Sequence, residues 1–152
     1  MPLVVVPLFF GIVNGGASGS GSADDGAYSV ELGGVVVLPI ADSSSIAGPL
    51  PRDTQVHAVP PATTQLRVEV VTAGKDTAQV ELIGSDGAYE NSYEETLPFG
   101  RIASHSGAQS ASIDVLATSS SGTAELQCRI YAGPVLVALS TSTSSVSCSA
   151  SW

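Results

Sequence analysis

Cys128 and Cys148 have the clearest capacity for covalent chemistry, because two thiols can oxidise to a disulfide. They are the only cysteines of the chain, and both fall in strand-like runs near its C-terminus. Two ligands cannot close a structural zinc site, which normally takes four, and His57 and His105 stand outside any ligand pattern. We therefore expect no metal, and either a disulfide or two buried thiols. A disulfide would stabilise the fold by roughly 3 kcal/mol and indicate an oxidising compartment.

Serines are abundant, but nucleophilic catalysis needs a serine, a base and an orienting group held together by rigid elements. Residues 16–22 have the spacing of a nucleophile elbow, yet a Gly/Ser linker cannot hold an oxyanion hole. His105 lies in a Ser-His-Ser-Gly turn typical of an exposed loop, and His57 lies beside prolines. We expect no catalytic residue, and we expect that the protein is not an enzyme.

Carboxylates could also support chemistry, as pairs in glycoside hydrolysis or as calcium ligands. Asp24, Asp25, Asp86 and Glu90 could contribute to a surface calcium site, but EF-hand spacing is absent. The single tryptophan is the last residue, so no aromatic platform for a sugar is apparent. A secreted carbohydrate- or calcium-binding module therefore has the weakest support. The sequence also lacks a P-loop and a GxGxxG after a strand, so we expect no cofactor.

The charge balance excludes another class of function. Five basic residues oppose 14 acidic ones, for a formal net charge of -9, and the basic residues are scattered singly. Nucleic acids and anionic membrane surfaces are bound by clustered lysine and arginine. We expect neither as a partner, although the apolar N-terminus leaves membrane attachment open.

The elements that must position the cysteines are strands. Apolar and polar residues alternate from residue 65 onward with a period of two, which is typical of half-buried antiparallel strands. Turn sequences separate these runs, at 73–76, 85–87, 119–122 and 132–134. The spacing predicts a small all-β sandwich or barrel over 65–152 in one domain of this 152-residue chain.

The first 64 residues have a different composition. Residues 1–13 are apolar but shorter than the roughly 20 residues of a membrane helix, so they are a truncated membrane or signal segment, a strand pair, or an inserting arm. Residues 14–64 form a Gly/Ser- and Pro-rich linker or arm. Within it, 27–40 predicts a hairpin or two strands joined at Gly33-Gly34, and 41–64 predicts an extended connection.

The second half carries an ordered series of short motifs. Leu-Arg-Val-Glu-Val-Val opens it at Leu66, and Ala-Gln-Val-Glu-Leu-Ile with an Asp-Gly turn follows. Thr-Leu-Pro-Phe-Gly stands at 96–100, and Gly-x-x-x-x-x-Cys-Arg-Ile at 122–130 precedes a turn, a strand and Cys148. From about Leu66 to Ser149 this order resembles the extracytoplasmic domain of the MmpS family, small mycobacterial membrane proteins. Phe99 stands where that family has tryptophan in Leu-Pro-Trp-Ser.

The resemblance implies an antiparallel Ig-like β-sandwich on the extracytoplasmic side of the cell envelope, following an N-terminal membrane helix. It implies a non-catalytic accessory role beside an MmpL-type transporter that exports lipids or siderophores. It also implies a disulfide between Cys128 and Cys148, and a sandwich turn at Leu97, Pro98 and Phe99. The apolar start has no basic flank, and residues 14–64 are longer than the family's linker.

A structural assembly protein is the alternative. A phage virion decoration or tail component could use the same sandwich, with residues 1–13 and 41–64 laid as arms over neighbouring subunits. Low charge and abundant serine and threonine fit that alternative.

Overall fold

The computed structural model describes residues 29–152 except 86, 88 and 106–109. The apolar segment 1–13, most of the Gly/Ser linker, and the candidate calcium ligands Asp24, Asp25 and Asp86 lie outside this range. The described part contains strands, one 3-10 turn and no α-helix, so none of it forms a helix that could span a membrane. The elements are β1 (Val30–Leu32), β2 (Val35–Pro39), the 3-10 turn (Ser43–Ser45), β3 (Gln65–Thr72), β4 (Thr77–Gly84), β5 (Tyr89–Thr96), β6 (Phe99–His105), β7 (Ser112–Ser119), β8 (Glu125–Ala132), β9 (Val135–Thr143) and β10 (Ser145–Ser151).

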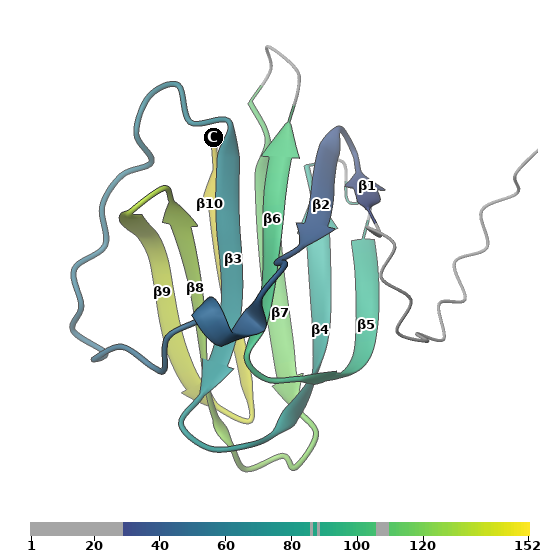
Figure 1. Cartoon of the computed structure of the whole chain (residues 1–152), viewed down its shortest axis with the longest axis vertical. Helices are drawn as coiled ribbons and strands as arrows, with labels where there is room; N and C mark the ends of the chain where they lie inside the picture. Colours follow the sequence, from purple (N-terminus) through teal and green to yellow (C-terminus); the bar gives the residue numbers. More distant parts are fainter. Residues whose placement is uncertain (1–28, 86, 88, 106–109) are drawn as a thin grey trace, which may run out of the picture.

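The strands form two antiparallel sheets packed face to face, which confirms the predicted all-β sandwich (Figure 1). Sheet A has the order β1-β2-β6-β3-β8-β9, and sheet B has the order β10-β7-β4-β5. The chain changes sheets repeatedly, so neighbours in sequence often lie in opposite layers.

The core lies between the sheets and follows from the period-two pattern. In β4 the residues Ala78, Val80 and Leu82 are buried, while the residues between them are half-buried on the outer face. Sheet A supplies the opposing layer from β3 and β8, including Leu66 and Ile130, which are fully buried. These strands bury their apolar positions as the alternation predicted.

Within the predicted segment 27–40, Val30–Pro39 forms a hairpin, one of the two predicted forms. β1 pairs with β2 across Gly33 and Gly34, whose φ values of 58° and 84° match the two left-handed positions of a tight hairpin turn. β2 then pairs with β6, so the sandwich also includes Val30–Pro39, which precede the boundary at residue 65 expected from sequence. A hairpin's own pattern cannot show which sheet edge it joins.

The proline-rich segment 41–64, called the strap below, connects β2 to β3 on the outside of the sandwich. It has no regular structure beyond the 3-10 turn, as the sequence predicted. Figure 1 shows that it passes in front of sheet A and continues around the β9 side before entering β3. Gly100 in β6 leaves space for the side chains of Ile40 and Ile46, where the strap begins. A Cβ at Gly100 would lie 2.3 Å from Ile40 Cδ1 and 2.8 Å from Ile46 Cδ1.

Candidate functional site

Cys128 and Cys148 come together across the two sheets. Cys128 lies in β8 of sheet A and Cys148 in β10 of sheet B, and both face the core. The structure places the sulfur atoms at bonding distance, with the Cα atoms 5.9 Å apart. This arrangement supports the disulfide over the alternative of two separate buried thiols.

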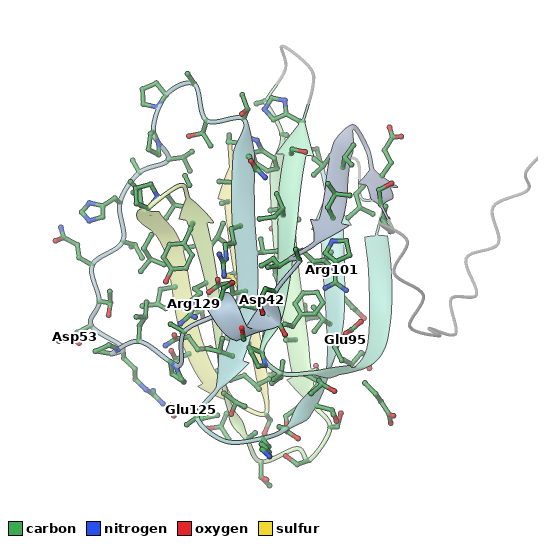
Figure 2. All side chains as sticks on the ribbon, in the orientation of Figure 1. Asp42, Asp53, Glu95, Arg101, Glu125 and Arg129 are labelled. Carbon is green, nitrogen blue, oxygen red and sulfur yellow. A yellow bond between two sulfur atoms is a disulfide. The ribbon has the colours of Figure 1, made fainter. Side chains whose placement is uncertain are left out.

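Leu97, Pro98 and Phe99 form the corner where the chain passes from β5 in sheet B to β6 in sheet A. The Leu97–Pro98 peptide bond is cis, and the side chains of Leu97 and Phe99 are buried in the core. The Arg101 guanidinium lies 4.2 Å from the centroid of the Phe99 ring. Its Nη2 lies 3.6 Å from Oε1 of Glu95 in β5, so this ion pair also joins the two sheets (Figure 2).

The two histidines lie in different parts of the fold and make unrelated contacts. His57 belongs to the strap, and its backbone N–H donates to the carbonyl of Leu136 in β9. His105 ends β6, and its ring lies 5.3 Å from the ring of Trp152 at the end of the chain. No group of three or more histidine, cysteine or acidic side chains within the described ranges is arranged to hold a metal ion.

A buried charged cluster lies on the outer face of sheet A, beneath the strap. Glu69 in β3 and Arg129 in β8 are direct cross-strand partners and are only 3% and 1% exposed. Arg129 Nε donates to Glu69 Oε2 at 2.5 Å, and Arg67 Nε lies 2.5 Å from the other oxygen, Oε1. A single carboxylate therefore bridges two guanidinium groups, and the three groups together carry one excess positive charge.

The same arginine attaches the strap to the sheet. Arg129 Nη1 donates to the carbonyl of Gly48 at 2.7 Å, and Nη2 donates to the carbonyl of Ala47. Figure 2 shows Arg129 on the face of sheet A that the strap crosses. Next along β8, the Gln127 amide binds both backbone groups of Leu50, donating to its carbonyl and accepting from its N–H, each at 2.8 Å. These bonds satisfy backbone groups of an irregular segment that would otherwise be costly to bury.

The pattern of residues in the sequence does not indicate this cluster. The alternation in β8 assigned Gln127 and Arg129 to a polar face exposed to solvent, and the structure buries both. Both do point away from the core, as the period of two requires, but the strap covers that face. Two features together could have indicated that Gln127 and Arg129 are buried. Both are long polar side chains on a central strand, and the proline-rich connection 41–64 is long enough to reach that strand.

Two shallow cavities indent the outer surface. The first, called the Arg67 notch, has a volume of about 220 Å³ and lies where the strap meets β3, β8 and the β8–β9 turn. It is lined by Ser45, Ala47, Arg67, Glu69, Arg129, Tyr131 and Gly133. The second is about 280 Å³, lies on sheet B, and is lined by Gln79, Glu94, Thr118, Ser119 and Ser120. Only the first presents cationic groups.

The second cavity adjoins a small carboxylate–hydroxyl cluster. Asp76 Oδ2 accepts hydrogen bonds from the hydroxyls of Ser119 at 2.6 Å and Ser121 at 3.2 Å. The Ser119 hydroxyl is the main reason why the pKa of Asp76 lies below its ordinary value of 3.8. These bonds hold the turn before β4 against the turn after β7, which is a structural role.

One sheet edge is open in the described part of the chain. Among the described strands, β10 pairs only with β7, and the hydrogen bonds between Trp152 and Ala111 set the alternation of its backbone groups. By that alternation the backbone N–H and C=O groups of four serines point to the free edge, namely Ser145, Ser147, Ser149 and Ser151. β10 carries no proline, no charge and no bulge.

The other edges are each protected. β1 has only three residues, and β5 contains a register shift beside Glu94, whose φ is 56°. The strap covers part of β9 through the hydrogen bond from His57 to Leu136. Short strands, bulges and covering segments are the usual protections of sheet edges, and β10 has none of them.

No protein-family model matches the chain, and no curated protein matches it significantly.

Proposed function

We propose that this chain is a non-catalytic accessory domain on the outer side of a cell membrane, acting beside an exporter of lipids or siderophores of the MmpL type. The observation that carries the proposal is the bonding-distance pair Cys128 and Cys148, which sits where the MmpS-like order of motifs places a disulfide. Disulfides persist in oxidising compartments and are rare in the cytosol. The pair therefore supports a location outside the cytoplasm.

A binding role is supported by which parts of the described surface are covered and which are open. The strap covers much of the outer face of sheet A, and three of the four sheet edges are protected. Among the described residues, the outer edge of β10 retains unpaired backbone groups of the kind that take up an added strand from another protein. We place the contact with an extended segment of the transporter at this edge.

The strap also bears on the alternative, a virion assembly protein. That alternative uses residues 41–64 as an arm over a neighbouring subunit. In the structure, Arg129 and Gln127 of the same domain hydrogen-bond to the backbone of the strap. These backbone groups are therefore not available to bind a neighbouring subunit. This favours the accessory domain.

The proposal is tested by expressing the chain from its own gene in its own host and fractionating the cells. We expect recovery with membranes, digestion of the sandwich by protease added to intact cells, and co-purification of a transporter after mild cross-linking. Recovery as a soluble, protease-resistant particle with many copies of the chain would refute the proposal and favour the assembly protein.

The proposed contact edge has its own test. Ser147→Pro removes an N–H that faces the free edge and makes no bond to β7, so the domain should still fold. Ser147→Ala is the matched control because it keeps that N–H. We expect the proline variant alone to lose the cross-linked transporter, and equal capture by both variants would show that the transporter does not use this edge.

A further inference from the structure

Four side chains form a compact block on the outer face of sheet A. Arg67 in β3 lies directly opposite Tyr131 in β8, and Glu69 lies opposite Arg129 one step along the same two strands. Directly opposed residues on one face of an antiparallel pair have Cβ atoms about 5 Å apart, so neighbouring members of the block can act on the same ligand. The Arg67 notch opens onto this block.

The block has an excess of one positive charge. Arg129 is saturated by Glu69 and by the carbonyls of Ala47 and Gly48. Arg67 is not, because its Nε contacts Glu69 but its Nη2 has only the Ser45 hydroxyl at 3.3 Å and its Nη1 has no partner among the described residues. The side chain of Arg67 is also 32% exposed, so solutes can reach it.

A second unused donor lies beside it. The hydroxyl of Tyr131 makes no hydrogen bond within the described part of the chain, although the residue is half-buried and its ring lies 5.9 Å from the Arg129 guanidinium. The Ser45 hydroxyl is not a further free donor, because it donates to the carbonyl of Asp42 at 2.7 Å and accepts from Arg67 Nη2. A planar guanidinium fork beside one free hydroxyl is a suitable set of donors for a planar anion.

We propose that the Arg67 notch is a carboxylate-binding site, in which Nη1 of Arg67 and the hydroxyl of Tyr131 donate to the two oxygens of one carboxylate. The charge count selects this class of ligand, because a monoanion neutralises the single excess charge. A phosphate dianion would leave a negative site in a chain that already carries a net charge of -9.

The size of the notch limits what it can take. Its volume of about 220 Å³ lies below the roughly 300–1,000 Å³ of sites that enclose a drug-sized ligand. It fits an acidic side chain of a protein, or a small free carboxylate, and it does not fit a lipid or a siderophore. The inference stands whether or not the proposed function does, because it depends only on these residues.

The test is an NMR titration of the 15N-labelled chain with sodium acetate, with sodium chloride at the same ionic strength as the reference. We expect saturable shifts centred on the amides of Arg67, Tyr131 and Gly133, with a Kd on the order of 1 mM. Arg67→Gln should weaken binding at least about tenfold, the equivalent of 1.4 kcal/mol. Arg52→Gln is the matched control, because it removes the same charge from the strap, and it should leave the affinity unchanged.

A second variant covers the case in which Arg67→Gln fails to fold. Tyr131→Phe keeps every ion pair of the block and removes only the hydroxyl, and we expect it to weaken acetate binding several-fold. A capped tripeptide with a central glutamate, compared with its glutamine analogue, distinguishes the two possible sources of the carboxylate, a protein side chain and a small free acid. Binding of the glutamate peptide assigns the notch to a protein side chain, whereas binding of acetate alone assigns it to a small free carboxylate.

Three results would overturn the inference. Equal acetate shifts around Arg52 and Lys75 would indicate an adventitious ion only. An affinity unchanged in both Arg67→Gln and Tyr131→Phe would place the anion elsewhere. Tighter binding of inorganic phosphate than of acetate would contradict the charge count.

Discussion

Glu69→Gln should destabilise the protein more than any other single change of a charged residue to its neutral isostere in the described sandwich. The variant keeps the size of the side chain and removes its charge. Arg129 would then be left 1% exposed with no counter-ion, and the amide would present N–H groups to one of the two guanidinium ions. Breaking a buried pair in this way costs about 3–5 kcal/mol. The hydrogen bond from Arg129 to the charged carboxylate contributes about 1.5–3 kcal/mol to this loss.

Urea denaturation measures this loss, followed by far-UV circular dichroism and by the fluorescence of Trp152, the single tryptophan. With a typical slope for a domain of this size, the midpoint should fall by about 2 M. A loss of that size is a large part of the 5–15 kcal/mol by which domains are usually stable. The carbonyls of the strap also lose a well-oriented donor, so proteolysis between residues 46 and 56 should accelerate.

Glu125→Gln is the matched control, because its pair with Arg52 is exposed, with side-chain exposures of 64% for Arg52 and 54% for Glu125. We expect it to cost at most about 1 kcal/mol. The double variant Glu69→Leu/Arg129→Met removes both buried charges and should recover most of the loss. The reasoning is refuted if Glu69→Gln costs less than about 1 kcal/mol, or if the exposed control costs as much.

Three further predictions follow from other parts of the sandwich. Reduction of the inter-sheet disulfide, which joins residues 20 apart, should lower stability by about 3 kcal/mol in urea denaturation, and two titratable thiols on the unfolded, unreduced chain would contradict the bond itself. Gly84→Ala should cost about 2 kcal/mol by the same assay, because the new Cβ would lie 2.3 Å from the carbonyl oxygen of Leu32, whereas Gly74→Ala meets no atom within 4 Å and should be neutral or stabilising. Asp76→Asn should lower Tm at neutral pH. Because hydrogen bonding from Ser119 lowers the pKa of Asp76 below 3.8, the wild-type advantage is present above about pH 4 and should vanish as pH falls through the lowered pKa; a difference in Tm that persists at pH 2 would be inconsistent with that cause.

The strand content could be predicted from sequence because it depends on local order. In β4, β7 and β8 the alternation of apolar and polar residues identifies which side chains face the core without any knowledge of the partner strand. The hairpin of β1 and β2 was readable for a similar reason, since Gly33-Gly34 can adopt the left-handed turn that other residues avoid. The sheet that this hairpin joins was not readable.

The candidate site could be predicted only in part. Cys128 and Cys148 were singled out because cysteine is rare in the chain and both residues share the inward register of their strands. Their proximity depends on β8 and β10 lying in opposite sheets at the same end of the sandwich, which is a property of the topology. Leu97, Pro98 and Phe99 were likewise chosen by motif, and the fold gives them the corner between the two sheets.

The buried cluster of Glu69, Arg129 and Gln127 was decided by tertiary structure alone. In the sequence pattern, each of these residues falls at a polar position of an alternating strand, which predicts a solvent-exposed face. The strap changes this, because it lies over that face and removes the solvent from around it. Alternation fixes the direction of a side chain relative to its own strand. Burial depends on what else covers that side, and a connection distant in sequence contributes nothing to the local pattern. The sequence determined the strands and the direction of each side chain, and the path of the strap determined which of the polar side chains became part of the interior.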